Sequence, residues 1–166
     1  MRLRPIRPTD NAAVATLIRA VMPEFGCVGP GFSIEDPEVD DMYGSYAAPR
    51  AGYFVVEDRA TDAGGGAPGL LAAAGYAPLA GADAQTCELR KMYAYPAARG
   101  RGIGRALLEA CVAGARAAGF TRMYLETHHA MTAAAELYAR NGFEALGGPL
   151  GATGHSGCDR YMARAL

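Results

Sequence analysis

A strand-like run, a glycine-dense turn and an apolar-periodic helix follow one another directly between Glu88 and Leu108, and this succession restricts the fold more than any other feature. The residues of the turn that bear on its chemistry are Gly100, Gly102, Gly104, Arg99, Arg101 and Arg105. The glycines leave the backbone bare, so successive N–H groups can approach an oxyanion at the positive end of the helix dipole. The arginines add full positive charge. The segment is therefore predicted to bind phosphate groups.

Spacing separates the known kinds of glycine-rich phosphate loop. A dinucleotide-binding loop reads Gly-x-Gly-x-x-Gly/Ala, but counting from Gly100 and Gly102 places Arg105 at the third site. A Walker loop needs Gly-Lys-Ser/Thr, which the sequence lacks. A turn that binds nothing is disfavoured, because each glycine would then weaken the start of the helix by about 0.5 to 1 kcal/mol. What remains is the pattern Arg99-x-x-Gly102-x-Gly104.

The rest of the chain alternates between strand and helix patterns. Strands are expected at 3–7, 53–57, 70–76, 87–94, 122–126, 143–146 and 160–166, and helices from a cap at Thr9 or Asp10 to Val21, from Pro37 to about Tyr46, from Ile103 to Gly119 and around Ala134–Tyr138. The strands at 53–57 and 70–76 should pair as a hairpin across the Gly64–Pro68 turn. This order predicts one α/β sandwich around a mixed sheet, a single domain over residues 1–166.

Composition limits which binding partners and which cellular location we expect for the protein. The chain has 16 Lys plus Arg against 17 Asp plus Glu, so it offers no global basic field for nucleic acid or an anionic membrane. No apolar run of about 18 residues and no apolar signal core occur. The four cysteines form no Cys-x-x-Cys pair. We therefore expect a reduced, cytoplasmic protein that binds neither nucleic acid nor membrane.

The turn, preceded by Tyr95-Pro96 and followed by a helix, resembles the acyl-CoA pyrophosphate loop of the GNAT superfamily of N-acetyltransferases. The pattern Ala134-x-x-Leu137-Tyr138-x-x-x-Gly142-Phe143 is similar to the second motif of that superfamily, and the order of elements matches along the chain. The resemblance implies a GNAT fold: a mixed central sheet of six to seven strands, flanked by about four helices and splayed between the fourth and fifth strands. It also implies acetyl-CoA as co-substrate and no metal.

The resemblance places the cofactor contacts on two segments. In the family, the pantetheine arm lies between the splayed strands, which here would be Glu88–Ala94 and Arg122–Thr127. The implied cofactor-binding residues are Met92, Tyr93, Ala94, Arg99, Gly100, Arg101, Gly102, Ile103, Gly104 and Arg105. An N–H freed by a bulge near Met92 could polarise the thioester carbonyl.

Two side chains are the implied catalytic residues. An alkylamine with a pKa of about 10.4 must lose a proton before it attacks, and Glu88 stands six residues before Ala94, where some GNAT enzymes keep a glutamate base. The alternative for Glu88 is a solvent-exposed strand carboxylate paired with Arg90 or Lys91. Tyr138 occupies the motif tyrosine and is expected to protonate the departing thiolate. Its alternative is an ordinary core residue.

Other polar residues leave several possibilities open. Met131 stands where the family often has a cofactor-binding asparagine, while Glu126 to His129 could supply a substitute base or a substrate contact. The paired histidines fit a surface loop better than a metal site, because no third ligand stands at a recognisable spacing. A covalent route through Cys87 or Cys111 has no support, so direct transfer in a ternary complex is expected.

The acceptor is expected to be a primary amine of a small molecule or a peptide. Six acidic residues crowd the segment from Glu24 to Asp41 and could attract a cation, or could simply be solvated. The glycine-rich segment 147–157, with His155, and nearby Asp159 could form the opposite wall. A non-catalytic acyl-CoA-binding module is the alternative function. A homodimer is possible, although no interface can be located in the sequence.

Overall fold

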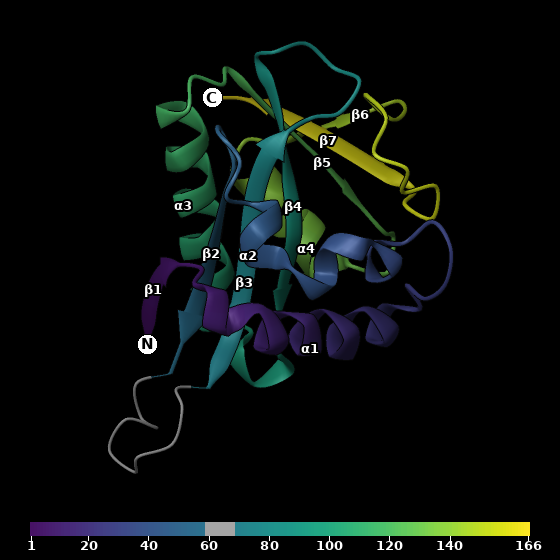
Figure 1. The fold of residues 1–166 in the computed structure, drawn as a ribbon. Helices are drawn as coiled ribbons and strands as arrows, with labels where there is room; N and C mark the ends of the chain where they lie inside the picture. The colour runs from purple at the N-terminus through teal and green to yellow at the C-terminus, as the bar shows by residue number, and fades with distance from the viewer. Residues whose placement is uncertain (59–68) are drawn as a thin grey trace.

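The computed structural model describes residues 1–58 and 69–166, whose strands form one mixed sheet (Figure 1). The strand order is β1-β2-β3-β4-β5-β7-β6. The strands are β1 Arg2–Pro5, β2 Gly52–Glu57, β3 Leu70–Pro78, β4 Thr86–Ala94, β5 Arg122–Thr127, β6 Glu144–Leu146 and β7 Arg160–Ala165. β2 and β3 pair antiparallel, which confirms the predicted hairpin. The turn predicted at Gly64–Pro68 lies outside the described residues.

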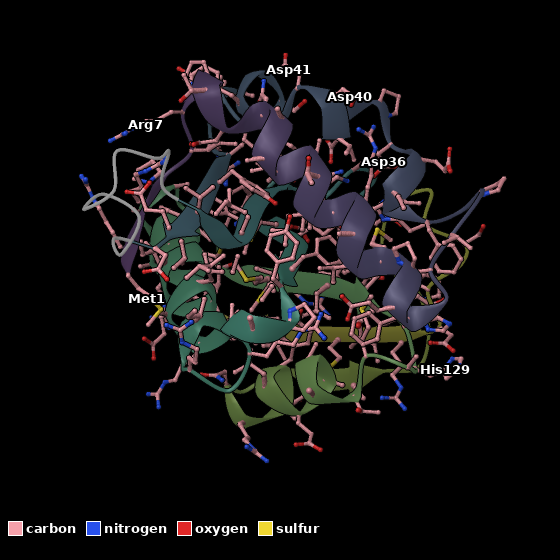
Figure 2. The ribbon with its side chains drawn as sticks, turned by 90° about the horizontal axis from the view of Figure 1, so that it is seen from below. Met1, Arg7, Asp36, Asp40, Asp41 and His129 are labelled. Atoms are coloured by element: carbon pink, nitrogen blue, oxygen red, sulfur yellow. The ribbon has the colours of Figure 1, made fainter. Side chains whose placement is uncertain are left out.

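Helices cover both faces of the sheet. In the described part of the chain the α-helices are α1 Asn11–Val21, α2 Met42–Ser45, α3 Ile103–Ala117 and α4 Thr132–Arg140. Helices α1 and α2 share an apolar core with Val55 of β2, whereas α3 and α4 share another with Leu125 of β5. Figure 2 shows α1 on one side of the sheet and α4 on the other. The predicted α/β sandwich is confirmed.

Helix α3 follows directly from its sequence pattern. Ile103, Leu107, Cys111 and Ala115 recur every fourth residue and all are buried, so they form one stripe against the sheet. The helix ends before Gly119, whose φ of +81° is the left-handed conformation that commonly follows a helix C-terminus. The predicted helix and its glycine stop are confirmed.

The sheet opens between β4 and β5, the neighbouring strands that run parallel. Their pairing covers only Thr86–Glu88 of β4 against Arg122–Tyr124 of β5. Beyond this point β4 continues to Ala94 paired with β3, and β5 continues to Thr127 paired with β7. The two strands therefore separate from each other while each stays paired with its antiparallel neighbour. This confirms the predicted splay between the fourth and fifth strands.

A β-bulge changes the direction of β4 beside this opening. Tyr93 pairs with Ala73 and Arg90 with Gly75, so β4 holds one residue more than β3 between the two pairs. Lys91 lies inside the bulge with a φ of +48°, an uncommon conformation for a residue with a side chain. The hydroxyl of Tyr53 donates a hydrogen bond of 2.8 Å to the Lys91 carbonyl and fixes the distorted segment.

The helix predicted from Pro37 to about Tyr46 is wrong as a single element. The structure has a 3₁₀ turn at Pro37–Asp40, then α2. Asp41 separates them with a φ of −138° and a ψ of 64°, and its carboxylate accepts a hydrogen bond from the Gly44 amide. Aspartate often competes with a continuing helix in this way, by binding backbone amides from a non-helical position.

Among the residues with a described structure, no helix has both the length and the apolar character needed to cross a bilayer.

Candidate active site

A groove of about 750 Å³ runs between the turn before α3, the end of β4 and helix α4. The predicted site residues that line it are Met92, Tyr93, Ala94, Arg99, Gly100, Gly102, Gly104, Arg105 and Tyr138. Two predicted cofactor residues do not line it. The Arg101 side chain is exposed outside the groove, and Ile103 is buried in the core below α3. Ile103 faces inward because it belongs to the apolar stripe of the helix.

The backbone amides of the turn are free to bind an anion. The amides of residues 100–105 have no hydrogen-bond acceptor among the described residues, and the first amide of this helix with an acceptor is that of Ala106, which donates to Gly102. Gly100 and Gly102 have φ values of +72° and +78°, with no atom near the place of a β-carbon. Its open glycines and unpaired amides are what an anionic group such as a diphosphate needs for close approach.

Gly104 has a different reason to be glycine. A β-carbon there would lie 3.2 Å from Cδ2 of Leu137 on α4 and 3.5 Å from Cε of Met92 on β4. The lack of a side chain therefore lets α3 approach both elements closely at the floor of the groove.

Two of the three arginines of the turn are paired with carboxylates. Arg99 donates to the Ala94 carbonyl at 3.0 Å and forms an ion pair of 2.9 Å with Glu24, while Arg105 pairs with Glu109 at 2.8 Å. The arginines therefore offer less free positive charge than their number indicates. The positive potential of this turn therefore comes chiefly from its backbone amides.

Tyr138 projects from α4 to the groove. Its side chain is 6% exposed and packs against Phe143 at 5.8 Å between ring centroids. Burial raises the pKa of its hydroxyl, which has no hydrogen-bond partner among the described residues. The hydroxyl therefore keeps its proton at neutral pH.

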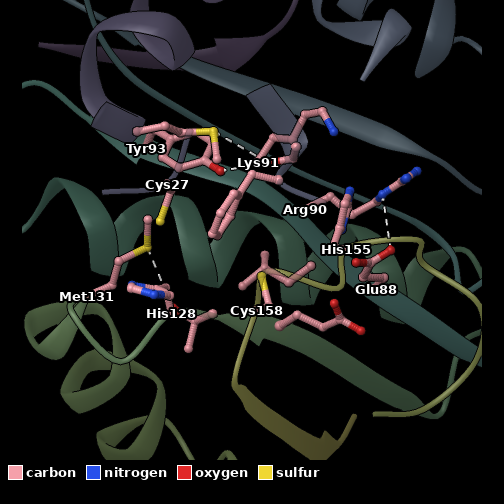
Figure 3. A pocket seen from close by; sticks show the side chains of 15 residues that line it. Cys27, Glu88, Arg90, Lys91, Tyr93, His128, Met131, His155 and Cys158 are labelled. Carbon is pink, nitrogen blue, oxygen red and sulfur yellow. Dashed lines mark hydrogen bonds and ion pairs between the residues drawn. The ribbon is translucent and has the colours of Figure 1, made fainter. Parts of the chain in front are cut away.

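A smaller cavity of about 50 Å³, lined by residues of both β4 and β5, adjoins the groove. Tyr93 and Met131 line both spaces, so the two meet at these side chains. Figure 3 shows Glu88, Arg90 and His155 at one end of the cavity and Tyr93, Met131 and His128 at the other. Met131, at the start of α4, thus forms part of the boundary between the two spaces.

Glu88 was predicted to be either a catalytic base or a solvent-exposed carboxylate paired with Arg90 or Lys91, and the structure has features of both. It is 4% exposed and lines the cavity, so it is not a solvent-exposed strand carboxylate. Arg90 nevertheless forms an ion pair with it, with 3.1 Å between Nε and Oε2. Burial raises the pKa of Glu88, and the positive charge of Arg90 opposes this rise.

A buried ionic network that the sequence analysis missed closes one wall of the cavity. The Lys91 side chain is 1% exposed and its ammonium contacts Asp36 and, at 2.6 Å, Glu38. His155 Nε2 lies 2.9 Å from the same Asp36 carboxylate. Burial by itself raises the pKa of Asp36, but the bonds to His155 and Lys91 outweigh it and lower the pKa to about 2.

Comparison with known proteins decides the family. Residues 15–143 match the acetyltransferase (GNAT) family. The chain belongs to the GNAT family. It is 39% identical over 165 residues to the uncharacterised N-acetyltransferase YjgM of Escherichia coli K12, a match that covers 99% of this chain and 94% of that protein. The protein is accordingly an acetyltransferase.

Solved GNAT structures have the same fold. An acetyltransferase of Staphylococcus aureus Mu50 superposes with a TM-score of 0.79 at 16% identity, covering 99% of this chain and 98% of that one. The protein yncA of Salmonella typhimurium, determined with its cofactor acetyl-CoA, superposes with a TM-score of 0.71 at 21% identity, covering 99% and 93%. These likenesses confirm the predicted GNAT fold.

The acidic segment of this GNAT protein is largely neutralised by its own cations. Glu24 pairs with Arg99, Glu38 with Lys91, and Asp40 with Arg19 at 2.8 Å. The segment therefore presents less free negative charge to an acceptor than its composition indicates.

In the folded chain, Asp159 lies beside the adjacent histidines His128 and His129 as a third residue that could bind a metal. Ligand atoms of His128, His129 and Asp159 lie within 4.8 Å of one another, although Asp159 is 30 residues away in the chain. His129 and Asp159 already bind each other at 2.6 Å, and both side chains are well exposed.

Cys87 and Cys111 are both buried, as predicted. Burial raises the pKa of the Cys87 thiol to about 12, so little of it is present as the reactive thiolate.

Proposed function

We propose that the protein transfers an acetyl group from acetyl-CoA to a primary amine by direct attack in a ternary complex. One observation carries the proposal: the sheet opens after Glu88, and this opening lies between a groove with unpaired amides and a small cavity with buried carboxylates. Acetyl-CoA would reach the opening from the groove, and the amine from the cavity. The solved relative that contains acetyl-CoA supports this co-substrate.

The turn before α3 and the end of β4 would hold the co-substrate. The amides of residues 100–105 bind the diphosphate, and the backbone of Met92 to Ala94 lies along the pantetheine arm. Because β4 has left β5 at this point, the backbone groups on its β5 side have no partner strand there, although β4 still pairs with β3. The bulge at Lys91 favours an amide turned toward the thioester carbonyl oxygen, where it would stabilise developing negative charge.

Two side chains would move the protons: the carboxyl group of Glu88 and the hydroxyl group of Tyr138. Glu88, in its ionised form, accepts a proton from the acceptor ammonium, directly or through water, and leaves a neutral amine. Bound acetyl-CoA supplies the thioester whose carbonyl carbon forms the new bond to this nitrogen while the bond to sulfur breaks. Tyr138 donates its proton to the departing sulfur, and the second proton, which the nitrogen loses as the amide forms, returns to Tyr138 through solvent. Arg90 supports the ionised form of Glu88, which burial alone would disfavour.

Two measurements test the proposal. Calorimetric titration should give saturable binding of acetyl-CoA, and a thiol assay with a panel of primary amines should give amine-dependent release of free CoA. An absence of binding at millimolar acetyl-CoA would contradict the co-substrate assignment. Binding without thiol release from any amine would instead support a non-catalytic acyl-CoA-binding module.

A further inference from the structure

Glu126 presents a buried carboxylate oxygen that the protein itself does not use. It lies on β5 and lines the small cavity. Its Oε1 accepts hydrogen bonds from the hydroxyls of Tyr124 at 2.7 Å and Thr153 at 2.9 Å. Its Oε2 is also buried, but it has no hydrogen-bond partner among the described residues. A buried acceptor without a donor is rare and costs free energy, so a ligand that brings a donor is the simplest account.

The other charges of the cavity already have partners. Glu88 is paired with Arg90, Lys91 with Glu38, and His155 lies against Asp36. No cation of the described residues forms an ion pair with Glu126. Glu126 therefore has no countercharge of its own among the described residues. Glu88 and Glu126 both line the cavity, and Glu126 acts through space to raise the pKa of Glu88.

The size of the cavity limits what can approach this oxygen. Its volume is about 50 Å³, whereas a site for one water molecule needs about 10 to 15 Å³. The enclosed space therefore holds about four non-hydrogen atoms. Phe32 and Met22 add apolar surface to its lining, which suits a short hydrocarbon chain behind a charged head.

We propose that Oε2 of Glu126 binds the protonated amino group of the acceptor, and that the enclosed part of the acceptor is an unbranched primary alkylamine of about four non-hydrogen atoms. This inference rests on the proposed function, since it assigns the acceptor to that site. Glu126 holds the ammonium through a charge-assisted hydrogen bond, and Glu88, close by, then receives the proton.

The test is an NMR-monitored titration of the full chain, in the absence of acetyl-CoA, with propylamine, 1-propanol and tert-butylamine as probes. The wild-type protein should bind propylamine at least tenfold more tightly than the uncharged 1-propanol and the branched tert-butylamine. E126Q should remove the preference for propylamine over 1-propanol, because its amide oxygen keeps the bonds from Tyr124 and Thr153 while an N–H₂ group replaces Oε2. E144Q, at the exposed Glu144 of β6, is the matched control and should bind like the wild type.

Equal affinity of wild-type protein for propylamine and 1-propanol would overturn the inference, and this comparison does not depend on the folding of any variant. Equal propylamine affinity in E126Q and E144Q would overturn it too. Equal affinity for propylamine and tert-butylamine would overturn the size limit. Because these are binding measurements, failure of acetyl transfer would contradict the proposed function alone, whereas active acetyl transfer without the amine preference would contradict this inference alone.

Discussion

Glu88 and Tyr124 form the last residue pair between β4 and β5, and beyond them the two strands separate. Glu88 is therefore both a member of the sheet, with its backbone held in register, and the first residue of the opening. A side chain at such a place is rigidly held and still faces a cavity, which is the combination that a catalytic base requires.

Replacement of Glu88 by glutamine should lower kcat/KM for the amine by about 10²- to 10⁴-fold, since the variant cannot accept the proton. Because the pKa of Glu88 is raised by burial above the ordinary value of 4.5, the acid limb of the wild-type pH profile should lie above pH 4.5. Activity falls as the pH drops through this pKa, because only the ionised carboxylate is a base. Initial rates of thiol release from pH 5 to 9 measure the limb.

The E109Q variant is the control for this pH profile, because Glu109 lies on the exposed face of α3. It should keep the wild-type profile. If E88Q kept the same acid limb as E109Q, another group would be the base.

Replacement of Tyr138 by phenylalanine should slow thiol release by about 10²-fold or more with little change in the dissociation constant of acetyl-CoA. The ring and its packing against Phe143 remain, so only the proton donor is lost. Steady-state kcat and calorimetry separate the two effects. Y43F, at a tyrosine that is 39% exposed, should leave both values unchanged. A Y138F enzyme with normal turnover would remove Tyr138 from the mechanism.

Replacement of Gly102 by alanine should weaken acetyl-CoA binding through the backbone. Its φ of +78° costs a residue with a β-carbon about 1 to 2 kcal/mol, so the turn would relax and its amides would lose their alignment. Gly119 at the other end of α3 has a φ of +81° and equally open surroundings, which makes G119A a matched control. Both variants should melt at a similarly lowered temperature, but only G102A should bind acetyl-CoA more weakly. Equal acetyl-CoA affinity in the two would show that the turn is not the anion site.

The network around Asp36 predicts a loss of stability in acid. Its pKa of about 2 lies below the ordinary value of 3.8, so the stabilisation is fully present above about pH 4 and is lost as the pH falls toward 2. Because the carboxylate is partly exposed, we expect about 1 to 2 kcal/mol rather than the full value. Urea unfolding from pH 5 to 2 should show a flatter dependence in D36N than in the wild type. D40N removes an exposed ion pair and should keep the wild-type slope; equal slopes in the two variants would contradict the role of the network.

The local sequence determined most of the elements and the turn with unpaired amides before α3. The four-residue spacing of Ile103, Leu107, Cys111 and Ala115 is enough to define α3 and its buried face, and the glycines before it define a turn with bare amides. The opening between the fourth and fifth strands followed from the resemblance to a known family. The predictions of the elements and of the turn depend on residues that are neighbours in the chain, where periodicity and turn chemistry act directly.

The acceptor side was decided by the tertiary structure. Asp36 meets Lys91 across 55 residues and His155 across 119, and no local pattern indicates either contact. The free oxygen of Glu126 exists because Tyr124 and Thr153 bind only its other oxygen, which depends on how a distant loop packs. Such pairings are set by the fold as a whole, because the desolvation of a charge and the presence of its partner depend on which segments come together in space.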